Sequence, residues 1–81
     1  MRANEAYSEK ELNDIQAKLV SRISALHKAK FNSNNSHLAA YAGCHERTIR
    51  RILLNQQNIT IVMLFKLCKA LEVSPSELLN W

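Results

Sequence analysis

Three arginines within one short segment are the side chains best suited to binding chemistry in this 81-residue chain. Arg47, Arg50 and Arg51 fall on the same arc of a helical wheel, together with Glu46 and Leu54. A guanidinium can contact phosphates, and it can pair with O6 and N7 of guanine, which discriminates between bases by roughly 1–3 kcal/mol. The segment therefore predicts binding of an anionic polymer, with double-stranded DNA as the first candidate.

The opposite arc of this segment carries Thr48, Ile49, Ile52 and Leu53. A helix with this distribution packs its apolar side on the domain and presents its charged side to a partner. We predict such a helix from about His45 to Leu54.

Polar side chains flank the predicted helix on both sides. Asn35 and Ser36 stand at the start of the preceding helix, and Gln57 and Asn58 lie in the following loop. Amide and hydroxyl groups contact the phosphates that border a groove. We therefore include these four residues in the predicted DNA interface.

Glu46 and His45 leave alternatives open. A carboxylate is repelled by phosphates, but Glu46 can accept a hydrogen bond from a cytosine amino group, or it can pair with Arg50 one turn later and hold it in place. We favour the pairing. His45 is either an imperfect N-cap or a base or phosphate contact, and the sequence does not decide between them.

Gly43, the only glycine in the chain, separates this helix from a shorter one over Ser36–Ala42. Glycine adopts a positive φ angle without steric cost, as a sharp turn requires. Two helices joined by a tight turn with a glycine form the helix-turn-helix arrangement, whose second helix can enter the major groove.

Three further helices are expected around this unit. The first begins with the capping box Ser8–Glu11 and runs to about Lys30, and Phe31 anchors its exit in the core. Its apolar stripe consists of Leu12, Ile15, Leu19, Ile23 and Leu26. Thr60 caps a fourth helix over Ile61–Leu71. The buried face of this helix holds Leu64, Leu67, Cys68 and Leu71, and its apolar arc is wide enough to be central or to carry a partner surface. Ser74–Glu77 starts a fifth helix that runs to Trp81.

Composition narrows the class of protein. The net charge is +4, with acidic residues near both ends and a basic middle, which suits an anionic partner. Cys44 and Cys68 are predicted to be buried, reduced thiols, and their spacing from the histidines is not that of a metal site. No catalytic constellation, cofactor motif or membrane-spanning segment is recognisable. We expect a cytoplasmic binding protein that is not an enzyme and needs no cofactor or metal.

In the spacing of its short motifs, the sequence resembles the lambda-repressor-like helix-turn-helix family, also called the xenobiotic-response-element type. The match runs without gaps from about Asn35 to Leu79, and its motif residues are Leu38-Ala39, Ala42-Gly43-Cys44, Ile49, Ile52, Thr60-Ile61, Leu64, Leu67-Cys68, Ala70-Leu71, Val73-Ser74 and Glu77-Leu78. The resemblance implies an all-α, compact five-helix domain, here with an extended first helix. It also implies DNA contacts from Asn35, Ser36, His45, Glu46, Arg47, Arg50, Arg51, Gln57 and Asn58.

The chain departs from the family pattern at three positions. Leu53 stands where the family usually has glutamate, Asn55 where it has glycine, and Ile59 where it often has proline. Asn55 can still supply a left-handed helix cap, because asparagine tolerates that conformation. We divide the chain into an N-terminal extension with the first helix (1–33) and the helix-turn-helix core with the last two helices (34–81), within one domain over 8–81.

The resemblance implies a sequence-specific transcriptional regulator, such as a repressor, that binds a palindromic operator as a homodimer. Two apolar surfaces could form the dimer: the extension with Tyr7, Leu12 and Ile15, and a patch of Val62, Phe65, Leu79 and Trp81. Either surface could instead belong to the core. The alternative function is a protein-interaction adaptor, or an antitoxin, on the same fold, with Leu53 and Glu46 as its sequence support.

Overall fold

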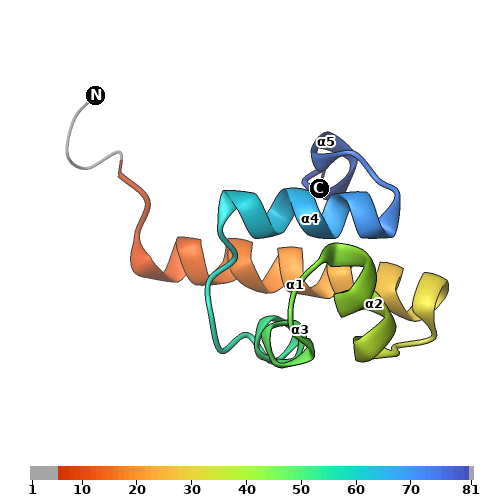
Figure 1. The fold of residues 1–81 in the computed structure, drawn as a ribbon. Helices are drawn as coiled ribbons and strands as arrows, with labels where there is room; N and C mark the ends of the chain where they lie inside the picture. Colours follow the sequence, from red (N-terminus) through yellow and green to blue (C-terminus); the bar gives the residue numbers. More distant parts are fainter. Residues whose placement is uncertain (1–5, 81) are drawn as a thin grey trace.

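The structure is a computed structural model that describes residues 6–80. This part of the chain consists of five helices and their connections. In chain order they are α1 (Glu9–Phe31), α2 (Asn35–Ala42), α3 (Glu46–Leu53), α4 (Ile61–Leu71) and α5 (Pro75–Leu78) (Figure 1). The predicted all-α class and the five-helix order are confirmed. Trp81, where the fifth helix was expected to end, lies outside the described residues.

The long helix α1 begins at the predicted capping box. The Ser8 hydroxyl accepts from the Glu11 N–H at 3.1 Å, and the Glu11 carboxylate accepts from the Ser8 N–H at 3.0 Å. Later in the helix Leu19 and Ile23 are buried. Leu12 and Ile15 belong to the same stripe but are 52% and 36% exposed, so the alternative that places them in the core is wrong. The first turns of α1 extend beyond the rest of the domain (Figure 1).

A tight turn at Gly43 joins α2 to α3. Gly43 has a φ angle of 72°, as predicted, and its N–H donates to the carbonyl of Ala39. Helix α2 starts one residue earlier than expected, because the Asn34 side chain caps it by accepting from the His37 N–H at 3.2 Å. Helix α3 is one residue shorter at each end than predicted, because His45 is its N-cap and Leu54 is its C-cap.

Helix α3 ends in a Schellman motif built on asparagine. Asn55 has a φ angle of 57°, its N–H donates to the Ile52 carbonyl, and the N–H of Gln56 donates to the Arg51 carbonyl. The expected left-handed cap at Asn55 is therefore present without glycine.

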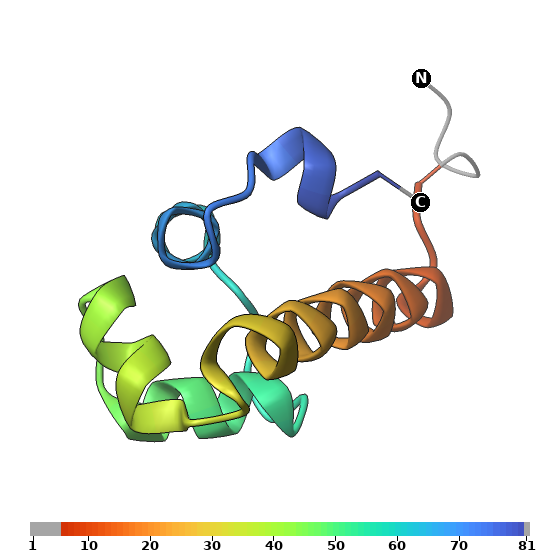
Figure 2. The ribbon, with the colours of Figure 1, turned by 90° about the vertical axis from the view of Figure 1, so that its right-hand side faces the viewer.

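The core lies where α2 meets α3 and α4, closed on the remaining side by α1 and α5. Figure 2 views α4 along its axis, with α2 and α3 below it and α5 above α1. The apolar side chains of the buried cluster are Leu19, Ile23, Leu38, Ala39, Ala42, Ile49, Ile52, Leu67, Cys68, Ala70, Leu71 and Leu78. Phe31 packs partly buried against this cluster, as expected for the exit of α1.

Helix α4 buries one face and exposes the other. Leu67 and Cys68 are buried as predicted, whereas Ile61, Val62 and Phe65 are exposed. The wide apolar arc of the sequence therefore divides into a central packing face, as predicted, and an exposed face; that the exposed face carries a partner surface stays a prediction.

Helix α5 is held to α1 by one arginine. Ser74 and Glu77 form the predicted capping box, but α5 ends at Leu78 and is shorter than expected. Arg22 of α1 donates through Nε to the Leu78 carbonyl at 2.8 Å and through Nη2 to the Glu77 carbonyl at 2.9 Å. None of the helices described is both long enough and apolar enough to cross a membrane.

Candidate nucleic-acid interface

The two faces of α3 differ sharply in burial. Ile49 and Ile52 are each only 1% exposed, whereas Arg47, Arg50 and Arg51 are exposed. The isoleucines belong to the buried cluster, and α3 packs against α1 and α2, which fixes the rotation of the helix about its axis. The predicted sidedness of α3 is confirmed.

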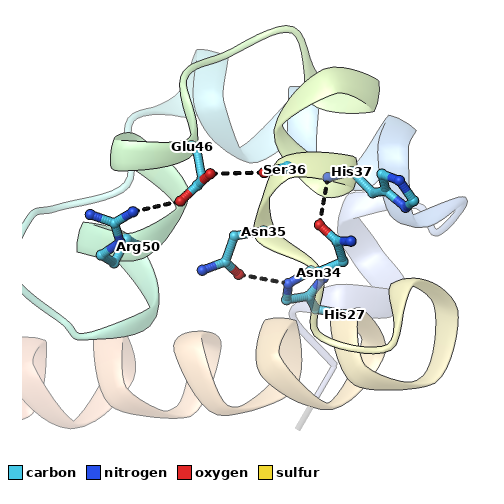
Figure 3. A network of polar contacts seen from close by, with 7 residues as sticks. All are labelled: His27, Asn34, Asn35, Ser36, His37, Glu46 and Arg50. Carbon is cyan, nitrogen blue, oxygen red and sulfur yellow. Dashed lines mark hydrogen bonds and ion pairs between the residues drawn. The ribbon is translucent and has the colours of Figure 1, made fainter.

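Glu46 connects the two helices of the helix-turn-helix unit (Figure 3). The Ser36 hydroxyl donates to Oε2 of Glu46 at 2.8 Å, and Nη2 of Arg50 donates to Oε1 at 2.5 Å. The favoured pairing of Glu46 with Arg50 is therefore present, and Ser36 is an additional partner that the sequence did not reveal. The Ser36 hydrogen bond and then the Arg50 pair hold the pKa of the Glu46 carboxyl below its ordinary value, so the group is ionised at neutral pH.

Asn35 is turned toward α1 by a buried histidine. Nε2 of His27 lies 2.9 Å from Oδ1 of Asn35 (Figure 3). A carbonyl oxygen only accepts, so Nε2 carries the proton, and Nδ1 is buried without a hydrogen-bond partner among residues 6–80. His27 is 1% exposed, and its position four residues after Ile23 was the one sequence signal for this burial. Asn35 therefore has only its amide NH2 left for a phosphate.

A hollow of about 560 Å³ opens at the start of α3. It is lined by His45, Glu46, Arg47, Thr48 and Arg51, so four of the nine predicted contact residues meet there. Thr48, predicted on the packing face, is half-buried and borders this hollow. His45 occupies the N-cap position, yet its exposed side chain makes no capping hydrogen bond.

The loop after α3 is fastened to α1. Nε2 of Gln16 donates to the backbone carbonyl of Gln57 at 3.2 Å. Gln57 is half-buried and Asn58 is exposed. The loop therefore has a defined place beside α3, although its two polar side chains lie apart from the hollow lined by the arginines.

Neither cysteine lines the hollow at the start of α3. Cys68 is buried as predicted, whereas Cys44 is only half-buried, and both are free thiols. Burial raises the pKa of both thiols. Within residues 6–80, no three His, Cys, Asp or Glu side chains come together as a group that could hold a metal ion.

Two short helices around a glycine turn, with the second helix exposing basic side chains, define a helix-turn-helix DNA-binding domain. A family model described as Helix-turn-helix matches residues 34–78, which is more than half of the chain. The protein thus belongs to the helix-turn-helix family of the lambda-repressor-like, xenobiotic-response-element type, a family of DNA-binding regulators. Neither the curated proteins nor the solved structures gave a significant match.

Proposed function

We propose that this protein is a sequence-specific transcriptional regulator, a repressor, that reads the major groove of double-stranded DNA with α3. The observation that carries the proposal is the orientation of α3. Ile49 and Ile52 are held in the core while Arg47, Arg50 and Arg51 all face outward from one rigid helix. A helix presented in this way fits the major groove, which is wide enough to admit it.

The outward arginines have different surroundings, and we assign them different roles. Arg50 is held by Glu46, which is itself fixed by Ser36, so its guanidinium is ordered before DNA arrives. Such pre-organisation lowers the entropy lost on binding and suits a base contact. Arg47 and Arg51 have no ion-pair or side-chain hydrogen-bond partner within residues 6–80, which leaves both free to reach bases or phosphates.

The polar residues around α3 complete the proposed contact surface. The amide of Asn35 and the side chains of His45, Gln57 and Asn58 would contact phosphates at the borders of the groove. The regulator would act in the cytoplasm as a homodimer on a palindromic operator. Its two reading helices would then lie about 34 Å apart, one turn of B-DNA.

Two contacts within the domain speak against the adaptor or antitoxin alternative. Leu53 packs partly buried against the core, so its apolar side chain is accounted for by the fold. Glu46 is engaged by Ser36 and Arg50, so its charge is balanced and need not repel DNA. Neither residue therefore indicates a protein partner.

The proposal is tested by replacing Arg50 and measuring affinity on an operator recovered from random DNA. Arg50→Ala should lower specific affinity by roughly tenfold or more, as expected for loss of a bidentate base contact, and should relax sequence preference. Lys69→Ala removes one positive charge from an exposed position on α4 and is the matched control. It should leave the preference unchanged. Equal losses in the two variants would mean that only net charge matters, and the proposal would fail.

A further inference from the structure

The first turns of α1 carry an apolar stripe that the rest of residues 6–80 leaves partly exposed, with Leu12 at 52% and Ile15 at 36%. Leu12 and Ile15 continue the line of Leu19 and Ile23, which pack in the core. The stripe therefore faces the same direction along the whole helix, but the domain covers only its second half. Exposed apolar surface that continues a packing face commonly marks an interaction site.

This uncovered stripe borders a groove of about 420 Å³ between α1 and the loop that leads from α3 to α4. The groove is lined by Glu9, Leu12, Asn13, Ile15, Gln16, Leu19, Asn58 and Ile59. The loop that follows α3 runs past α1 on the side of the domain where the first turns of α1 project (Figure 1). Anything bound there sits next to the proposed DNA interface.

We propose that this surface binds a second copy of the same chain, with the two α1 helices antiparallel. The proposal rests on the homodimer of the proposed function and identifies its interface. When Leu12 of one copy faces Ile15 of the other, the two-fold axis makes the contact occur twice. In the same register Glu11 lies close to Lys18 of the second copy, again on both sides of the axis, because these residues flank the stripe on one edge. Apolar and charged groups are thus matched together.

The exposed face of α4 lacks this self-complementarity. Ile61, Val62 and Phe65 are accompanied on α4 by Lys66 and Lys69, and the helix has no acidic residue. Two copies of this face could not form an ion pair between the α4 helices. A dimer through α1 also has a positional advantage, because a two-fold axis beside the α3–α4 loop can bring both reading helices to the same side of the pair.

The contact is small. A few helical turns bury less than the roughly 1,200 Å² of a standard specific interface. We therefore expect weak association of the free protein. Binding of both copies to one operator should strengthen it, because the second contact then becomes intramolecular.

Charge substitutions at the two facing positions test the register. Leu12→Lys and Ile15→Glu each place a charge in the apolar contact, so either variant alone should self-associate more than tenfold more weakly than the original chain, the loss typical of a central interface residue. An equimolar mixture should recover association, because the introduced ammonium of one copy then faces the introduced carboxylate of the other. Val62→Glu is the control on the α4 face and should leave the dimer unchanged. All five samples, including the original chain, are measured by sedimentation equilibrium of the full chain without DNA.

Three results would overturn the α1 interface. One is a mixture that associates no better than either variant, and another is a dimer that Val62→Glu dissociates while Leu12→Lys does not. The third is an original chain that stays monomeric at millimolar concentration. A failure of sequence-specific DNA binding would refute the proposed function instead. If the α1 dimer still formed in that case, the proposed interface would stand although the proposed function had failed.

Discussion

The turn between α2 and α3 gives the sharpest test of how the reading helix is positioned. Gly43 has a φ angle of 72°, and a Cβ atom built on it would meet nothing within 4 Å. The replacement Gly43→Ala therefore introduces no clash. Its whole effect must come from placing an L-residue with a side chain in the left-handed region.

The size of the expected stability loss therefore follows from the backbone conformation alone. The left-handed conformation costs a non-glycine residue roughly 1–2 kcal/mol, partly offset because alanine restricts the unfolded chain. A net loss of about 1 kcal/mol in a domain of this size lowers the Tm by roughly 4–8 °C. Because the neighbourhood of Gly43 is open, DNA affinity measured well below the Tm should not change.

Thermal unfolding followed by circular dichroism at 222 nm measures this effect, with Gly43→Asn as the matched control. Asparagine tolerates the left-handed region better than alanine, so its Tm should fall by less. A Gly43→Ala protein as stable as the original would refute the assigned turn conformation. Equal and large losses in both variants would mean that space, not φ, limits this position.

For three other substitutions the structure predicts the direction of the change in stability. Glu72→Gly should raise the Tm, because Glu72 has a φ angle of 57° and its ion pair with Lys30 involves a side chain that is 71% exposed; a lower Tm would show that the ion pair dominates. Asn34→Ala should cost about 1 kcal/mol in urea unfolding through loss of the α2 cap, and an unchanged midpoint would show that the cap is dispensable. Glu46 has a lowered pKa, so its contribution to stability is complete above its ordinary value of 4.5 and is lost as the pH falls through the lowered folded value. The Tm difference between the original chain and Ser36→Ala should therefore shrink in acid, whereas a constant difference would contradict the Ser36–Glu46 hydrogen bond.

Local chemistry made much of the fold predictable. The caps at Ser8, Thr60 and Ser74 were recognisable because a hydroxyl before an apolar run satisfies a free amide within the next turn. The orientation of α3 was predictable because a short helix with two isoleucines on one arc, Ile49 and Ile52, has only one way to bury them.

Contacts between elements were not predictable in the same way. The Oδ1 atom of Asn35, for example, accepts from His27, a residue of another helix whose proximity depends on how the intervening loop folds. Helical periodicity also identified the correct face of α1 at Leu12 and Ile15, yet it carries no information on how far the rest of the domain extends along that helix.

The interface around Glu46 combines the two cases. Arg50 lies four residues after Glu46 on the same helix, so their pairing could be expected from spacing alone. The hydrogen bond from Ser36 comes from the preceding helix and required the geometry of the Gly43 turn. The charged groups are thus predictable from the sequence, whereas the fold determines which of them are held in place.

Selection of binding sites from random double-stranded DNA is the measurement that tests the central claim most directly. If α3 reads the major groove, repeated selection with the full chain at physiological salt should converge on one sequence, and sites arranged as inverted repeats should be enriched with their half-sites one helical turn apart. A pool that stays random at every salt concentration, while still binding more weakly as salt rises, would show attraction to phosphates alone and would contradict sequence-specific recognition.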